Sequence, residues 1–227
     1  MYENVIQKFE DVINVNDAFN SFIFNFALKS IEESKSNLKF LIGVPGSGKS
    51  FLVNYYASKY PDTIILQGTI SSKEELNEFL YDDKLIIIDE AQLLDLKMIE
   101  YIRILTDTKK YSFLLSMHTK DAKELLSKEH FKSRNIDVIE LKPITKEEMI
   151  QYINSKLIQN NAHHIFTKKE FNIIYNYTQG NFRYIKKFVK TLFELLNFAA
   201  KNNLSKYKKI NSCLITMTAI KLGLENG

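Results

Sequence analysis

The stretch from Leu38 to Phe51 constrains the fold of this chain more than any other part of its sequence. An apolar run leads into a loop with three glycines, and Lys49 and Ser50 then open a helical pattern that continues to about residue 58. Residues 43–50 fit G-x-x-x-x-G-K-[ST], in which glycines let successive backbone N–H groups turn toward a phosphate chain. A glycine-rich turn between a strand and a helix is the alternative. We expect a nucleotide site, because strand, loop and helix occur in the order that such a site requires.

The residues of this loop have distinct expected roles. Lys49 reaches the β- and γ-phosphates, and Ser50 supplies a hydroxyl to Mg²⁺. The helix that begins at Lys49 points the positive end of its dipole at the same phosphates. The residues expected to contact the nucleotide are Gly43, Val44, Pro45, Gly46, Ser47, Gly48, Lys49, Ser50 and Phe51.

A second apolar run, residues 85–88, ends in two adjacent carboxylates, Asp89 and Glu90. The run does not alternate with polar residues, which is typical of a parallel strand covered on both faces. Asp89 is placed to hold Mg²⁺ through water, and Glu90 to orient or deprotonate an attacking water. One strand–helix unit lies between the two motifs, and this inserted strand indicates the NTPase class in which the glutamate is catalytic. A strand that ends in a surface acidic pair is the alternative.

The next expected strand, residues 111–118, brings polar side chains to the same edge of the sheet. Ser116 and His118 lie on one face of it, at the end where ligands collect in open α/β sheets. A polar residue at this position commonly senses the γ-phosphate. We favour His118 for this role over Ser116, while a hydrogen-bonded structural histidine remains the alternative.

The pattern divides the chain into two parts. Residues 1–144 predict an α/β domain with a five-stranded parallel sheet, whose further strands are residues 63–67 and 136–141. Its N-terminal helical segment, residues 1–37, includes a helix from about 16 to 33 that packs on the body. From Thr145 the pattern is wholly helical and begins with a capping box that ends at Glu148. Residues 145–227 therefore predict a small all-α lid domain.

The composition limits the cellular compartment and the kinds of partner that we expect for this protein. Cys213 is the single cysteine, which predicts a reducing compartment. No apolar run approaches the roughly 18 residues that span a bilayer, so we expect a cytoplasmic protein without direct membrane insertion. From Thr145 onward the chain has 13 lysine and arginine residues against 5 aspartate and glutamate residues. This basic part either faces nucleic acid or an acidic partner, or is a solvated lysine-rich surface.

Arginine is rare in this lysine-rich chain, where it occurs only at positions 103, 134 and 183. A planar and permanently charged guanidinium suits contact with phosphate oxygens. Arg134, before the last strand, suits contact from a neighbouring subunit, and Arg183, in a helix start at 180–183, suits contact within the chain. We expect a structural or interface role for Arg103. The alternative is that the three positions arose by chance.

Together these residues resemble an AAA+ ATPase. The resemblance covers residues 17–222 and rests on Gly-Val-Pro-Gly-Ser-Gly-Lys-Ser, Ile-Ile-Ile-Asp-Glu-Ala-Gln and Gly-Asn-Phe-Arg. It is greatest to the ExeA/TniB-type branch, on residues 89–93, 141–145 and 180–183. The resemblance implies a P-loop NTPase three-layer sandwich of the ASCE type with ATP and Mg²⁺ as cofactors. It also implies Glu90 as general base, Arg134 as arginine finger and Arg183 as second sensor.

The strand-end sequence Ser-Met-His-Thr departs from this family, in which Gly-Gln or Thr is more usual. Secretion members of the branch also carry a membrane segment and a wall-binding domain, which we do not find in this sequence.

Two functions follow from the resemblance. The first is an ATPase that forms a homo-oligomer on ATP binding and drives a DNA-linked process such as DNA uptake or transposition, with DNA contact through the basic lid. The second is an energiser that docks on an inner-membrane protein of a type II secretion or pilus-like system. A slowly hydrolysing adaptor is disfavoured by Glu90, and a kinase would not need Glu90, Arg134 and Arg183 together. We do not expect a DEAD-type helicase, because it would require a second motor domain. Adenine specificity is implied by the resemblance alone.

Overall fold

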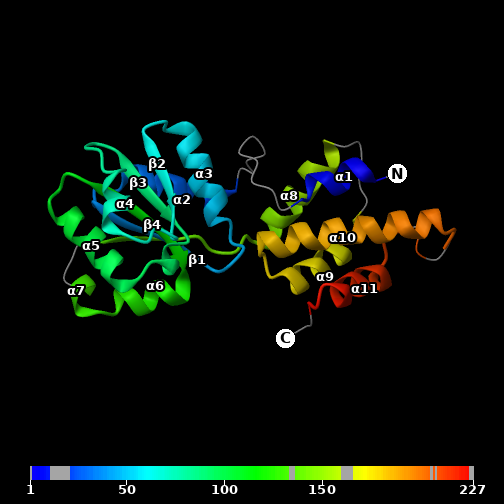
Figure 1. Ribbon diagram of the computed structural model, residues 1–227. Helices are drawn as coiled ribbons and strands as arrows, with labels where there is room; N and C mark the ends of the chain where they lie inside the picture. Colours follow the sequence, from blue (N-terminus) through cyan, green and yellow to red (C-terminus); the bar gives the residue numbers. More distant parts are fainter. Residues whose placement is uncertain are drawn as a thin grey trace. The chain divides into compact units, whose positions relative to one another are not determined.

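The chain folds into two compact units, and each is described by itself (Figure 1). The computed structural model describes residues 2–10, 21–132, 136–159, 166–204, 207 and 209–224. One unit, the sheet unit, is Ile13–Lys142, and the other, the helical unit, combines Met1–Val12 with Pro143–Gly227. The division falls near Pro143 and groups the first twelve residues with the helical unit.

The sheet unit contains the five-stranded parallel sheet that the sequence predicts. The strands lie in the order β2-β3-β4-β1-β5, and every neighbouring pair is parallel. Mostly apolar runs form the inner strands, because both faces of a parallel sheet are covered. Their bounds are β1 (Leu38–Gly43), β2 (Thr63–Gln67), β3 (Leu85–Asp89), β4 (Ser112–His118) and β5 (Asp137–Glu140).

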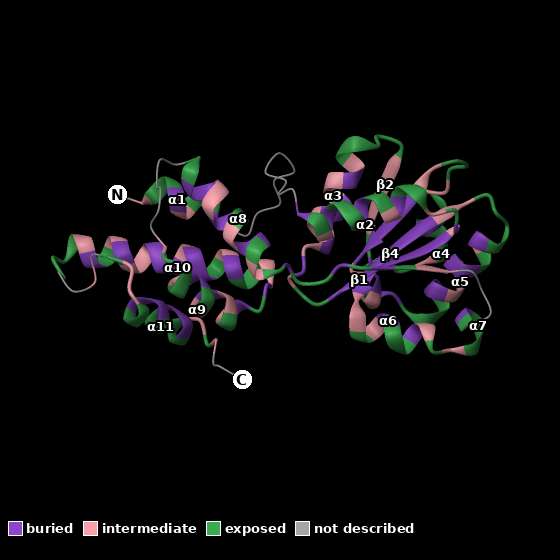
Figure 2. Cartoon of the chain, turned by 180° about the vertical axis from the view of Figure 1, so that it is seen from behind, coloured by how far each residue is buried: buried purple, intermediate pink, exposed green. Residues whose placement is uncertain are grey.

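Helices cover the two faces of the sheet and make three layers (Figure 2). Alternate side chains of each strand enter opposite cores, as the pleat requires. Leu41, Ile87 and Leu114 meet one set of helices, and Phe40, Ile86 and Phe113 face the other side. The first side is covered by α2 (Phe22–Glu33) and α3 (Lys49–Lys59), and the second by α4 (Lys73–Asn77), α5 (Leu96–Asp107), α6 (Thr119–Leu126) and α7 (Glu129–Lys132).

The strand that separates β1 from β3 in the sheet is β4, and β2 lies at the edge. Pairing between strands follows side-chain packing and crossover geometry, so sequence order does not determine it. The order matters for the site, because β4 brings its own polar residues between the phosphate loop and Asp89.

The helical unit is built around α10 (Phe182–Lys201), whose buried face is lined by Ile185, Phe188 and Leu192. The short helix α1 (Glu3–Lys8) packs on it, and the backbone N–H of Tyr2 donates a 3.1 Å hydrogen bond to Asn197 Oδ1. The other helices are α8 (Lys146–Ile158), α9 (Lys168–Thr178) and α11 (Ser212–Lys221). The expected capping box of Thr145 and Glu148 starts α8.

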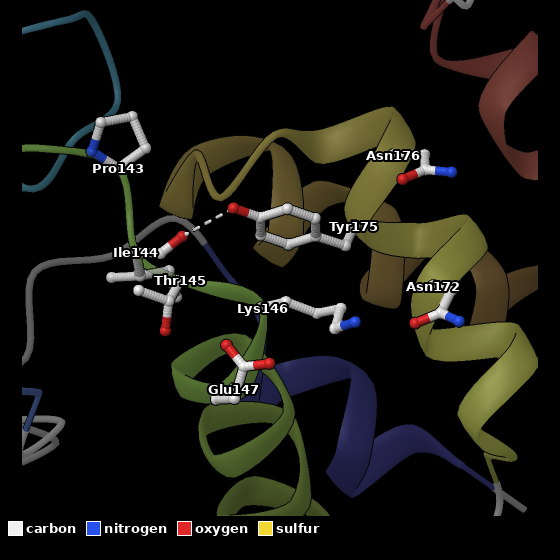
Figure 3. A pocket seen from close by; sticks show the side chains of 8 residues that line it. All are labelled: Pro143, Ile144, Thr145, Lys146, Glu147, Asn172, Tyr175 and Asn176. Atoms are coloured by element: carbon white, nitrogen blue, oxygen red, sulfur yellow. Dashed lines mark hydrogen bonds between the residues drawn. The ribbon is translucent and has the colours of Figure 1, made fainter.

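Within the helical unit, the segment that leads into α8 is joined to the start of α10. The N–H of Ile144 donates a 3.0 Å hydrogen bond to the carbonyl of Gly180, and Tyr175 Oη lies 3.5 Å from the Ile144 carbonyl oxygen. This segment forms one wall of an open pocket (Figure 3). The pocket is lined by Pro143, Ile144, Thr145, Lys146, Glu147, Asn172, Tyr175 and Asn176.

Candidate nucleotide site

The phosphate loop connects β1 to α3 through a tight turn. Gly46 and Gly48 have φ values of 80° and 102°, which favour glycine, and the Ser47 N–H donates to the Val44 carbonyl at 3.1 Å. A Cβ at Gly43 would lie 2.5 Å from Ser47 Oγ and 2.8 Å from the Leu141 carbonyl oxygen. The three glycines of the motif are therefore required by the backbone itself.

Polar groups of the loop are arranged for an anion. Lys49 is buried, and its Nζ donates to the carbonyls of Gly43 at 3.0 Å and Val44 at 3.4 Å, so the ammonium lies over the loop. Among the described residues, no side chain caps the N-terminus of α3 at Gly48. The Ser47 hydroxyl is buried and has no hydrogen-bond partner in the described part of the chain. Buried polar atoms are normally satisfied, so the loop fits a phosphate-bearing ligand.

Ser50 and Phe51 follow Lys49 in the first turn of α3. Ser50 is half-buried, and within the described ranges its hydroxyl makes no hydrogen bond, so this oxygen is free to ligate Mg²⁺. The Phe51 ring packs on Phe24 at 5.5 Å and on Tyr55 at 6.3 Å between ring centroids. Its side chain thus belongs to the core between α2 and α3, which leaves only its backbone for the nucleotide.

Asp89 ends β3 beside β4 and is almost fully buried. Its Oδ1 accepts a 2.7 Å hydrogen bond from the hydroxyl of Ser116, which is itself fully buried. Ser116 therefore orients the carboxylate. In the register of the sheet, Gly43 pairs with His118 and Gln67 with Asp89, so the ends of β1, β2, β3 and β4 meet at one edge. The two motifs found in the sequence are brought together by this arrangement.

Glu90 stands in the left-handed region, with φ 54° and ψ 38°, and begins the 3-10 turn η2 (Ala91–Leu93). Gly68 packs on this turn, since a Cβ there would lie 2.1 Å from the Glu90 carbonyl oxygen. Gln92 Nε2 donates a hydrogen bond to Glu90 Oε2. Non-glycine residues seldom adopt this conformation, and those that do are concentrated at functional sites.

His118 lies between two carboxylates. Its Nε2 is 3.7 Å from Glu90 Oε2, and its Nδ1 is 3.5 Å from Asp121 Oδ2 in the first turn of α6. The imidazole is partly exposed, unlike the buried Ser116 hydroxyl. Of the two candidates for the sensing position, His118 is the one that lies beside Glu90 with a side chain that solvent reaches.

The three arginines have different surroundings. Arg134 lies outside the described residues. Arg183 is exposed near the start of α10, where its backbone N–H donates to Asn181 Oδ1 at 3.1 Å. Arg103 pairs with Glu100 and Asp107 on its own helix, and the hydrogen bonds that its guanidinium donates to Glu100 raise the pKa of the guanidinium. The structural role expected of Arg103 is consistent with these contacts.

Three residues around Glu90 were not singled out from the sequence: Gly68, Gln92 and Asp121. Gln92 and Asp121 could have been found from spacing, because Gln92 is two residues from Glu90 and Asp121 is three from His118. Gly68 had no such signal. Its contact with Glu90 depends on the pairing of β2 with β3, which brings residues distant in sequence together.

The sequence matches no protein-family model and no curated protein. The structure is similar to the Thermotoga maritima RuvB Holliday junction branch migration motor, with 20% identity and a TM-score of 0.61 over 89% of this chain and 68% of that chain. The Walker-type ATPase paby2304 of Pyrococcus abyssi aligns with 15% identity and a TM-score of 0.66 over 95% of this chain and 79% of that chain. The ADP form of the Aeropyrum pernix ORC2 protein aligns with 12% identity and a TM-score of 0.58 over 94% of this chain and 71% of that chain.

The five-stranded parallel sheet with its helical C-terminal region has the architecture of these three neighbours, which is that of AAA+ P-loop NTPases. The fold is therefore that of AAA+ P-loop NTPases, as the sequence predicted. In the described part of the chain, no helix is both long and apolar enough to cross a membrane.

Proposed function

We propose that this protein is an AAA+ ATPase that binds and hydrolyses ATP with Mg²⁺. The observation that carries the proposal is the meeting of the phosphate loop, Asp89 and Glu90 at one edge of the sheet. Loop N–H groups and Lys49 would bind the β- and γ-phosphates, and Ser50 and Asp89 would hold the metal, Asp89 through water. Mg²⁺, when bound, neutralises charge on the phosphate oxygens.

Glu90 acts as the general base in this proposal. Its carboxylate takes a proton from the attacking water, whose oxygen forms the new bond to the γ-phosphorus while the bond to the β,γ-bridging oxygen breaks. Glu90 is well placed for this step because its side chain is partly exposed, whereas Asp89 is buried beside it. His118 is the residue proposed to sense the γ-phosphate, since it lies between Glu90 and Asp121.

The arginines are proposed to link hydrolysis to assembly. Arg183 acts within the chain as the second sensor, and Arg134 acts on the ATP of a neighbouring copy, so that a homo-oligomer forms on ATP binding. The guanidinium groups of both arginines can stabilise the negative charge that develops on phosphate oxygens during hydrolysis. We also propose that the protein belongs to the ExeA/TniB-type branch, because residues 89–93, 141–145 and 180–183 resemble that branch. The domain roles follow, with the sheet unit as nucleotide-binding domain and the helical unit as lid.

The process that we favour involves DNA, such as DNA uptake or transposition. Two observations support it: the excess of basic residues after Thr145, and a neighbour described as a Holliday junction motor. Contacts with phosphates alone would give little sequence specificity and strong salt dependence. Within the described residues, the exposed basic side chains of the helical unit are Lys8, Lys168, Lys169, Arg183, Lys187, Lys201, Lys209 and Lys221.

The experiment is steady-state ATP hydrolysis by the purified protein over a range of protein concentrations, with and without single- and double-stranded DNA. The Glu90→Gln variant is the blank. Specific activity that rises with concentration, and rises further with DNA, is the expected result. Lys187→Glu tests the DNA contact, and Lys97→Glu, on the exposed surface of the sheet unit, is its matched control. Hydrolysis that DNA does not change would overturn the DNA-linked process and favour a membrane-protein partner.

A further inference from the structure

The turn after β3 folds Gln92 back onto Glu90. Two features lock this turn: the left-handed backbone of Glu90, and the close approach of Gly68 to the Glu90 carbonyl. The single 3-10 turn is closed by a 3.0 Å hydrogen bond from the Leu93 N–H to the Glu90 carbonyl. This geometry lets the Gln92 amide reach the carboxylate two residues earlier, where its Nε2 donates to Glu90 Oε2.

The oxygen of the Gln92 amide indicates that the hydrogen bond to Glu90 determines how the amide is oriented. Its Oε1 is buried and has no hydrogen-bond partner within the described residues. A buried amide oxygen without a donor is unfavourable, and such groups are rare in folded proteins. Turning the amide over would place this oxygen against the negative charge of Glu90, and the donor would be lost. The amide therefore leaves one of its own atoms unsatisfied while it binds the carboxylate.

The two oxygens of Glu90 consequently differ. Oε2 accepts from Gln92 and lies 3.7 Å from His118 Nε2. Within the described ranges, Oε1 makes no hydrogen bond. We propose that Gln92 is a positioning residue for Glu90: its amide anchors one carboxylate oxygen, so that the other is presented to the attacking water. This inference rests on the proposed ATPase function, and it assigns to Gln92 a role in orienting the base and none in binding nucleotide.

The test is a double-mutant cycle on hydrolysis. Gln92→Met keeps the length of the side chain and removes its donor, and it is made alone and together with Glu90→Gln. Gln151→Met, at an exposed position of α8, is the matched control. For each variant kcat is measured with ATP, and ADP affinity is measured by titration calorimetry.

We expect Gln92→Met to lower kcat on the order of 10-fold with ADP affinity changed less than about twofold, because only the base is misplaced. In the Glu90→Gln background the same substitution should have no further effect, since residues that act as a unit are not additive. An equal loss in both backgrounds, a loss confined to ADP affinity, or an unchanged kcat would overturn the inference while the ATPase function stands. Absence of hydrolysis by the unsubstituted protein would overturn the proposed function and the inference with it.

Discussion

The hydroxyl of Ser116 donates a 2.7 Å hydrogen bond to Asp89, and both side chains are buried between β3 and β4. The two residues are 27 positions apart in the chain. This bond explains why a carboxylate can stand at the buried end of β3, because the Ser116 hydroxyl satisfies one of its oxygens. It also gives Ser116 a structural task that is different from contact with a phosphate.

The Ser116→Ala substitution should lower the free energy of unfolding by about 1–3 kcal/mol, because it leaves a buried carboxylate oxygen without its donor. Urea unfolding followed by circular dichroism measures this change. Ser127→Ala is the control, since Ser127 is exposed and its hydroxyl bonds to a carbonyl of its own helix. If the two variants lose the same stability, the bond to Asp89 is not a stabilising one.

Lys49→Ala should reduce ADP and ATP affinity by a factor on the order of 10² or more, because the ammonium group makes charge-assisted hydrogen bonds to phosphates. Titration calorimetry gives the dissociation constants. Lys97→Ala removes an exposed lysine of α5 and should bind like the unsubstituted protein. Unchanged binding by Lys49→Ala would contradict the assignment of the phosphate loop.

Glu90→Gln should retain nucleotide binding and lose hydrolysis by a factor on the order of 10² or more, since the amide cannot accept the proton of the attacking water. Single-turnover kinetics separate this loss from slow product release. Glu124→Gln, at an exposed position of α6, is expected to hydrolyse normally. Near-normal turnover by the Glu90 variant would exclude Glu90 as the base.

Gly180→Ala should destabilise the helical unit more than Gly223→Ala does. Both glycines have positive φ, 70° and 65°, so each substitution incurs a backbone cost of about 1–2 kcal/mol. Only at Gly180 would the new Cβ meet another atom, the Ile144 carbonyl oxygen, at 2.0 Å, whereas it meets nothing within 4 Å at Gly223. Thermal unfolding of the two variants isolates this contact, and equal midpoints would show that the chain relieves the clash.

Features that depend on a short stretch of chain were predictable from the sequence. The phosphate loop and the start of α3 follow from glycines at fixed spacing before Lys49. The capping boxes at Thr145 and Thr167 and the end of β3 at Asp89 are also local. The sequence pattern predicts the capping box at Thr145, and the structure adds the one at Thr167. In each case neighbouring residues satisfy one another's backbone groups, so spacing alone carries the information.

Features that join distant residues were predicted less well. The order of the strands in the sheet was not predicted, because nothing local shows that β4 inserts between β1 and β3. The same holds for α1, which packs on α10 although the whole sheet unit lies between them in the chain. The arginine-finger role of Arg134 stays a prediction, since that residue lies outside the described part of the chain.

The sequence by itself determined that this chain forms a phosphate loop, a buried acidic strand end and a helical C-terminal unit, because each arises from residues adjacent in the chain. Only the tertiary structure decided that Ser116 binds Asp89, that Gln92 and His118 surround Glu90, and that Gly68 packs beneath that turn. Apart from the short-range bond of Gln92, these contacts join strands whose pairing depends on burial of both faces of the sheet. That packing is a property of the whole fold, and no stretch of sequence specifies it alone.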